Sequence, residues 1–246
     1  MNRWCLYPAR RGLARVRLLC FPHAGGAASV FYEWGALLPE WVELVAVQMP
    51  GRATRLSEAP LLSIAALAEG AWNGLAPLLD RPYALLGHSL GSLVAFEFAR
   101  LAQSRQCAAP AVLMALGCPP PHLLGSARTY DLPTTKLIKE MQRLGAASSA
   151  LLHSPQMLEL VLPALRADLE AYETYQFTDA PALRCPIQAW AGVTDASLAP
   201  AALGDWAVHT TAAFSAVFFA GGHFFLEEDR AAVLASVQSA LIAVLP

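Results

Sequence analysis

Short apolar segments alternate with longer segments of helical periodicity along most of the chain. The apolar runs are rich in Val, Leu, Ile and Phe and are continuous, as in strands that are buried on both faces of a sheet. We predict strands at 16–21, 42–49, 83–88, 111–117, 186–192 and 216–221, and helices near 29–38, 61–79, 90–104, 199–209 and 228–244. This alternation predicts an α/β fold with a doubly wound, mostly parallel sheet.

One long stretch, 119–181, interrupts the alternation because it contains no convincing strand. Two helical patterns occupy it, at 133–145 and 154–175, and the second opens with Ser154-Pro155, which is typical of an N-cap followed by proline. We predict a single domain, 1–246, that carries a helical lid insertion at 119–181. The alternative is a pair of ordinary helices packed on a face of the sheet.

Composition limits the function without identifying it. Hydrophobic residues make up 56% of the chain, charged residues 15%, and the net charge is −2, so nothing indicates binding to nucleic acid or to an acidic membrane. No apolar run suits a membrane span. The five cysteines form no C-x-x-C pair, which favours reduced thiols and a cytoplasmic location. The arginine-rich start could indicate a transit peptide, but it is poor in serine and continues directly into a predicted strand.

The most informative motif is GHSLG, in which Ser89 lies between Gly87 and Gly91. It fits G-x-S-x-G, and it has the flanks that give this motif meaning, a strand before it and a helix after it. In such a turn the serine hydroxyl is held at the carboxyl edge of the sheet, over the start of a helix. We therefore predict that Ser89 is a nucleophile. The alternative is a polar residue that only begins a buried helix.

A serine nucleophile needs a base and an orienting acid, which in this architecture follow it in the order acid, then histidine. His223 is the only histidine that follows the last predicted strand, and we predict it as the base. Asp195, just after the preceding strand, is the predicted acid, with Asp179 and Asp205 as rivals. The other histidines have less suitable places: His88 within the turn is expected to be structural, His122 and His153 lie in the lid, and His209 is expected to be solvated or to cap a helix.

The oxyanion hole of such a site uses the amide after the nucleophile, here that of Leu90, and one from a loop after an early strand. The sequence CFPHAGGAAS supplies this loop, with Ala24 as the predicted donor and His23 as its rival. No phosphate-binding motif and no metal-ligand spacing occur, so no metal is expected. The predicted reaction is acyl transfer to water, and the triad alone leaves oxygen ester, thioester and amide open.

Taken together, the motifs resemble the type II thioesterases that accompany polyketide and nonribosomal peptide synthetases. The resemblance is carried, in order, by LLCFPHAGGAAS, VQMPGRATR, YALLGHSLGSLVAFEFAR, LPALRADLEAYETY, CPIQAWAGVTD and FFAGGHFFLEE. It implies an α/β-hydrolase fold with a helical lid and the triad Ser89, Asp195 and His223. It also implies hydrolysis of stalled or mis-primed acyl and aminoacyl groups from the phosphopantetheine arm of carrier domains, with no cofactor of the enzyme's own. One departure is that Ala53 follows P-G-R, where the family often has an acidic residue.

The lid offers a candidate docking surface for an acidic carrier domain. Lys136, Lys139 and Arg143 are spaced at i, i+3 and i+7 and so share one face of a helix. The alternative is a solvated lid face. Two other functions stay open at this level: a free carboxylesterase or lipase-like hydrolase, and a hydrolase-like binding module, against which the intact triad argues. The expected oligomeric state is a monomer.

Overall fold

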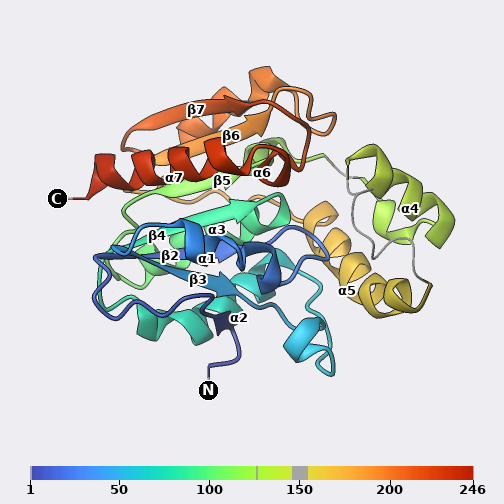
Figure 1. Ribbon diagram of the computed structural model, residues 1–246. Coiled ribbons are helices and arrows are strands. Elements are labelled where there is room, and N and C mark those ends of the chain that lie inside the picture. The colour runs from blue at the N-terminus through green and yellow to red at the C-terminus, as the bar shows by residue number, and fades with distance from the viewer. Residues whose placement is uncertain (1, 126, 146–154, 246) are drawn as a thin grey trace.

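The computed structural model describes residues 2–125, 127–145 and 155–245, apart from the side chain at 155, and is built around a seven-stranded sheet (Figure 1). The strand order is β1-β3-β2-β4-β5-β6-β7, and every neighbouring pair except β1–β3 is parallel. The strands are β1 Cys5–Leu6, β2 Val16–Phe21, β3 Val42–Val47, β4 Tyr83–His88, β5 Leu113–Leu116, β6 Ile187–Gly192 and β7 Phe214–Phe219. The predicted doubly wound α/β sheet is thus confirmed.

The N-terminal edge strand β1 was not predicted. It has only two residues, too few for any periodicity, and it pairs antiparallel with β3 through Cys5 and Val47. The strands predicted at 16–21 and 83–88 have the expected bounds, whereas those at 42–49, 111–117 and 186–192 are shorter by one to three residues. The strand expected at 216–221 lies two residues earlier, at 214–219.

The strands are apolar at successive positions because the sheet has a hydrophobic core on each of its two faces. On β2, Leu19 and Phe21 join one core, while Leu18 and Cys20 join the other. The first core is covered by α2 (Ile64–Leu75), α3 (Leu90–Ser104) and the 3₁₀ helix η8 (Pro200–His209), and the second by η1 (Ala28–Phe31), α1 (Trp34–Leu37) and α7 (Arg230–Val244). The prediction of burial on both faces is wrong for β7, an edge strand with exposed residues along its length.

The helices at 90–104 and 228–244 form much as predicted, and α2 continues into the short 3₁₀ helix η3 (Ala76–Leu78) within the predicted 61–79. Two other predictions need correction. The segment 29–38 is divided between η1 and α1, which are too short for the expected continuous helix, and 199–209 forms the 3₁₀ helix η8. Side-chain caps fix two starts: Ser63 accepts from the Ala66 amide before α2, and Asp229 accepts from the Ala232 amide before α7.

Between residues 119 and 181 the described part of the chain forms helices and turns and no strand, as predicted. The elements are η4 (Pro121–Leu123), η5 (Thr129–Asp131), α4 (Thr134–Arg143) and α5 (Pro155–Glu173); Ser154, the predicted N-cap, lies outside the described residues. Figure 1 shows α4 and α5 beside the sheet, at the end toward which the parallel strands point. Their packing against each other forms a small core of Leu137, Leu165 and Leu169.

No helix among the described residues combines the length and the apolar character needed to cross a bilayer.

Candidate active site

Ser89 lies at a sharp turn between β4 and α3, with φ 54° and ψ −121°. Few residues other than glycine adopt such a positive φ, and such strain is typical of functional sites. The turn needs glycine on both sides. A Cβ on Gly87 would lie 2.2 Å from the Gly91 carbonyl oxygen, and a Cβ on Gly91 would lie 2.2 Å from the Phe21 carbonyl oxygen. The sequence G-x-S-x-G is therefore a steric requirement of this turn.

The serine occupies the N-cap position of α3 but does not cap the helix. Its backbone amide donates to the Leu116 carbonyl at 2.7 Å, while its side chain makes no capping hydrogen bond. The residue is partly exposed between buried neighbours, His88 and Leu90. Ser89 thus stands at the start of a buried helix, as both interpretations of the sequence require. Its hydroxyl makes no capping hydrogen bond and is available for chemistry.

The predicted base and acid are brought together by two loops that follow neighbouring strands. The loop after β6 is joined to the loop after β7 by hydrogen bonds from the Val193 amide to Phe219 and from the Thr194 amide to Gly221. As a result, His223 Nδ1 lies 2.8 Å from Asp195 Oδ2. The rival acids lie elsewhere. Asp205 is exposed on η8, and Asp179 lines a cavity beside His122 and His209.

Asp195 is poised to stay ionised although it is only 8% exposed. Burial acts to raise its pKa, but hydrogen bonds from His223 and Ser197 outweigh this effect and lower the pKa. A carboxylate in this position holds the imidazole with Nδ1 protonated, which leaves Nε2 free to accept a proton.

The imidazole of His223 lies at the same corner of the sheet as Ser89. Gly117 follows the carbonyl that accepts the Ser89 amide, and a Cβ on Gly117 would lie 3.4 Å from Cε1 of His223. The Phe224 ring packs edge-on against the imidazole, with the two ring centres 5.4 Å apart. The structure therefore brings Asp195 and His223 together at the part of the carboxyl edge where the Ser89 turn lies.

His88 has the structural role expected for it. Its Nε2 makes a 2.8 Å hydrogen bond with the backbone oxygen of His223 and so ties the loop of the base to the turn of the nucleophile. Burial holds the pKa of His88 well below its usual value, and burial likewise lowers the pKa of His23 to about 4, helped by the charges of His223 and Arg52. Both rings are therefore neutral at pH 7, and His88 contributes a contact that positions the His223 loop.

The two predicted oxyanion donors lie on adjoining segments. The start of α3 touches the loop after β2, because Gly91 abuts the carbonyls of Phe21 and Pro22. Within the described residues, neither the Leu90 amide nor the Ala24 amide donates a hydrogen bond to another protein group. Unpaired backbone amides, that of Leu90 at a helix start and that of Ala24 in a turn, are well suited to hold a developing oxyanion.

Ser197 is a member of the site that the sequence analysis missed. Its hydroxyl donates to Asp195 Oδ1 at 2.6 Å, its amide donates to the same oxygen at 2.8 Å, and its Oγ lies 3.1 Å from His223 Nδ1. The only signal for it in the sequence is a serine two residues after an aspartate, the spacing of an Asx turn, which is common in any loop.

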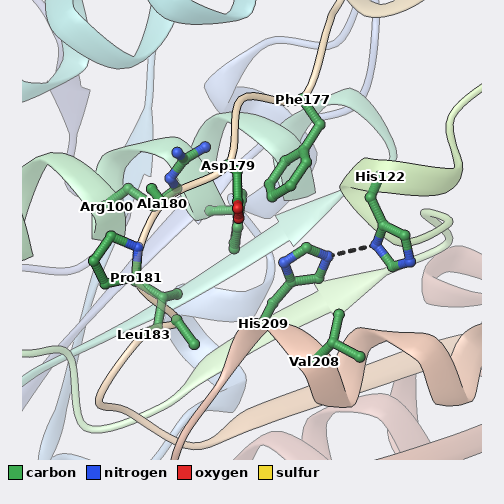
Figure 2. Close-up of a pocket in the computed structure, with 11 residues that line it drawn as sticks. Arg100, His122, Phe177, Asp179, Ala180, Pro181, Leu183, Val208 and His209 are labelled. Carbon is green, nitrogen blue, oxygen red and sulfur yellow. Dashed lines mark hydrogen bonds between the residues drawn. The ribbon is translucent and has the colours of Figure 1, made fainter.

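A cavity of about 310 Å³ lies between α3, η8 and the segment 177–183, which follows α5. None of the three predicted catalytic residues lines it. Figure 2 shows His122 and His209 facing each other there, joined by a 2.8 Å hydrogen bond between Nδ1 and Nε2, with Phe177 beside them. The expectation that His209 is solvated or caps a helix is wrong: it is 5% exposed and packs against Phe96 and Trp206.

Among the described residues, no group of three or more His, Cys, Asp or Glu side chains is arranged to hold a metal ion. The five cysteines are all free, and four of them are buried.

The sequence-family model of the thioesterase domain matches residues 16–241 of this chain. The chain belongs to the thioesterase domain family. Among curated proteins it is 34% identical over 231 residues to gramicidin S biosynthesis protein GrsT of Aneurinibacillus migulanus, covering 94% of this chain and 90% of that protein.

Two solved structures extend the similarity to the whole fold. The type II thioesterase BorB of the borrelidin biosynthetic cluster superposes with a TM-score of 0.91, at 34% identity and 97% coverage of both chains. The thioesterase RedJ of the prodiginine pathway of Streptomyces coelicolor superposes with a TM-score of 0.90, at 36% identity, covering 94% of this chain and 92% of that one. The resemblance noted in the sequence and the α/β-hydrolase fold are thus confirmed, and the chain is a hydrolase of thioesters.

Proposed function

We propose that this thioesterase is a type II editing enzyme, which hydrolyses stalled or mis-primed acyl and aminoacyl groups from the phosphopantetheine arm of carrier domains in polyketide or nonribosomal peptide synthesis. The observation that carries the proposal is the Asp195–His223 pair beside the Ser89 turn, in a chain that superposes over 97% of its length on the type II thioesterase BorB. The thioester arm belongs to the partner carrier domain, and the enzyme is proposed to need no cofactor of its own.

The geometry supports a two-step reaction. Ser89 Oγ attacks the thioester carbonyl while His223 Nε2 takes its proton, and the resulting oxyanion accepts hydrogen bonds from the Leu90 and Ala24 amides. The C–S bond then breaks, His223 returns the proton to the leaving pantetheine sulfur, and an acyl-serine remains. In the second step His223 activates water, which attacks the acyl-serine and releases the free acid and Ser89. Asp195 holds the imidazole throughout and favours its charged form.

The helical insertion at 119–181 is proposed to act as the lid over this site. In support, α4 and α5 lie at the end of the sheet that carries the triad, and α5 contacts the loop that provides the Ala24 amide. On α4, Lys136, Lys139 and Arg143 are all exposed, and we propose this face as the docking surface for an acidic carrier domain. Arg143 also pairs with Glu140 at 2.9 Å. Because this carboxylate offsets the charge of Arg143, the net positive charge of the surface comes from the two lysines.

The protein is proposed to act as a cytoplasmic monomer. All three triad residues come from one chain, so no second copy is needed to complete the site. Free cysteines fit a reducing compartment.

The decisive experiment compares two substrates under single-turnover and steady-state conditions: an acyl group on a phosphopantetheinylated carrier domain, and the same acyl group as a p-nitrophenyl ester. The proposal expects a kcat/KM for the acyl-carrier at least tenfold above that for the ester, with both activities lost in Ser89→Ala. A preference for the free ester would make the enzyme a carboxylesterase, and acyl release unchanged in Ser89→Ala would refute serine catalysis.

A further inference from the structure

Asp168 of helix α5 is a fully buried carboxylate, 0% exposed, at a point where three segments of the chain meet. Its Oδ2 accepts the backbone N–H of Gly25 at 2.7 Å, and its Oδ1 accepts Arg52 Nη2 at 2.8 Å, while Nη1 of Arg52 also donates to Oδ2. Arg52 is the arginine of P-G-R. Although Ala53 stands where the family often has an acid, this loop therefore does make a charged contact, through Arg52 itself.

The Gly25 amide is one peptide unit beyond Ala24, the proposed oxyanion donor. Because a peptide unit is planar, a hydrogen bond that fixes the Gly25 N–H also fixes the Ala24 carbonyl and restricts rotation at Ala24. Arg52 holds the same loop from its other side, since its Nη1 donates to the Gly26 carbonyl at 3.3 Å. The loop is thus held at two successive residues by one buried ion pair.

Apolar packing joins the same loop to the lid. The Ala24 side chain packs against the small core formed by Leu137 of α4 and by Leu165 and Leu169 of α5. The fit is close, because a Cβ on Gly25 would lie 3.2 Å from Cδ1 of Leu165. A displacement of α5 would therefore move two groups at once: the Leu165 side chain, which packs against the Ala24–Gly25 loop, and the Asp168 carboxylate, which holds that loop.

We propose that Asp168 is a positioning residue for the oxyanion hole, and that it places the Ala24 amide correctly only while α5 is seated against the core. An ionised carboxylate with a bidentate arginine suits this role, because charge-assisted, two-point hydrogen bonds fix direction as well as distance. The inference rests on the proposed function in one respect, the assignment of Ala24 as an oxyanion donor.

The test replaces the buried pair as a unit, since removing one partner alone would leave an unpaired buried charge. The double variant R52M/D168L removes the acceptor of the Gly25 amide and leaves no charge behind. We expect kcat to fall about 10- to 100-fold, as for a small misplacement of a catalytic group, with KM changed less than about threefold. The conservative single variant R52K keeps a cation beside Asp168, and its kcat is expected to stay within about fivefold of the wild-type value.

The chain offers a matched control at the opposite edge of the sheet. Glu43, at the start of β3, is also buried, pairs with Arg17 at 2.9 Å and accepts a backbone N–H, that of Arg11, at 3.1 Å. The variant R17M/E43M also replaces a buried ion pair by apolar side chains, although Arg17 has a second, exposed partner in Asp80, and it is expected to leave kcat within about twofold of wild type. An equal loss of kcat in both double variants would overturn the proposal, because it would indicate a general structural effect.

A second readout separates positioning from stability. The inhibition constant of an acyl trifluoromethyl ketone, which forms a tetrahedral adduct with a serine, should rise in R52M/D168L by the factor by which kcat/KM falls. If R52M/D168L does not fold, the more conservative pair R52Q/D168N, which also leaves no buried charge, is measured instead, and at least a fivefold loss of kcat is expected. Unchanged kcat in a folded variant, or a loss confined to KM, would refute the role of Asp168.

All of these measurements use a p-nitrophenyl ester, so they do not require a carrier domain. If the ester assays confirm the effect while acyl-carrier is not hydrolysed, the carrier-editing function fails and the positioning role of Asp168 stands.

Discussion

The hydroxyl of Ser197 donates to Oδ1 of Asp195 at 2.6 Å, while the other carboxylate oxygen accepts from His223. The predicted catalytic acid is therefore held from both sides, and its direction toward the imidazole does not depend on His223 alone. Residues that orient a catalytic group in this way commonly contribute to the rate without contacting the substrate.

The first prediction concerns this hydroxyl. We expect Ser197→Ala to lower kcat about tenfold, because Asp195 loses a hydrogen bond that orients it and that helps to lower its pKa. Ser197→Thr keeps the hydroxyl and should retain most of the activity. Steady-state kinetics with a p-nitrophenyl ester measures both, and equal activity of the alanine and threonine variants would contradict the role of the hydroxyl.

The second prediction tests the acid itself. Asp195→Asn keeps the size of the side chain but removes the charge that holds the imidazole, so kcat should fall on the order of 10³- to 10⁴-fold with little change in KM. Asp205→Asn provides the matched control, because Asp205 is exposed on η8 and is one of the two rival acids in the sequence. If Asp205→Asn proved as damaging as Asp195→Asn, the assignment of the acid would be wrong.

The sequence is sufficient to predict the sheet and the meeting of Asp195 with His223 because both depend on local patterns. The run VRLLCF predicts β2 because each face of that strand meets its own core, and GHSLG predicts the turn because no other residue than glycine fits at 87 and 91. Asp195 and His223 are expected to lie close together because each follows a parallel strand and the carboxyl ends of such strands share one edge, and their side chains do meet.

Contacts between distant segments could not be predicted in this way. Asp168 meets Gly25 across 143 residues, and His209 meets His122 across 87, so neither pairing leaves a periodic or local signal. The helical pattern around His209 by itself favours a solvated or capping role for this histidine. Its burial depends on Phe96 and Phe177, which come from two other parts of the chain.

The third prediction follows from the buried histidines. Burial, together with the charges of His122 and Arg100, lowers the pKa of His209 to about 4, whereas the unfolded chain binds this proton near pH 6.5. The unfolded state therefore binds more protons between these values, and the free energy of unfolding must fall as the pH drops from about 6.5 toward 4. His209 contributes up to about 3 kcal/mol to this loss.

Urea unfolding at pH 7.5, 6.0 and 5.0 measures the effect. His209→Phe, which cannot bind the proton, is expected to be less stable than wild type at pH 7.5, since His122 loses its partner, but to lose less stability on acidification. His23 and His88 have lowered pKa values too, so a residual dependence on pH is expected in the variant. Parallel stability curves for the two proteins would show that His209 is not the group responsible.

The fourth prediction concerns the proposed docking surface on α4. The double variant K136E/K139E reverses two exposed charges while leaving the Arg143–Glu140 pair intact. If an acidic carrier domain docks here, KM for acyl-carrier should rise about tenfold and become less dependent on salt, because rim charges act mainly on association. KM for a small acyl thioester should not change, since that substrate does not contact the surface.

The matched control is R15E/R184E, two exposed arginines that precede β2 and β6 at the opposite edge of the sheet. It changes the net charge by the same amount and so accounts for any long-range electrostatic effect on an acidic partner. A rise in KM that is equal in the two double variants would indicate net charge rather than docking. A rise that also occurs with the small thioester would indicate that the lid itself is disturbed.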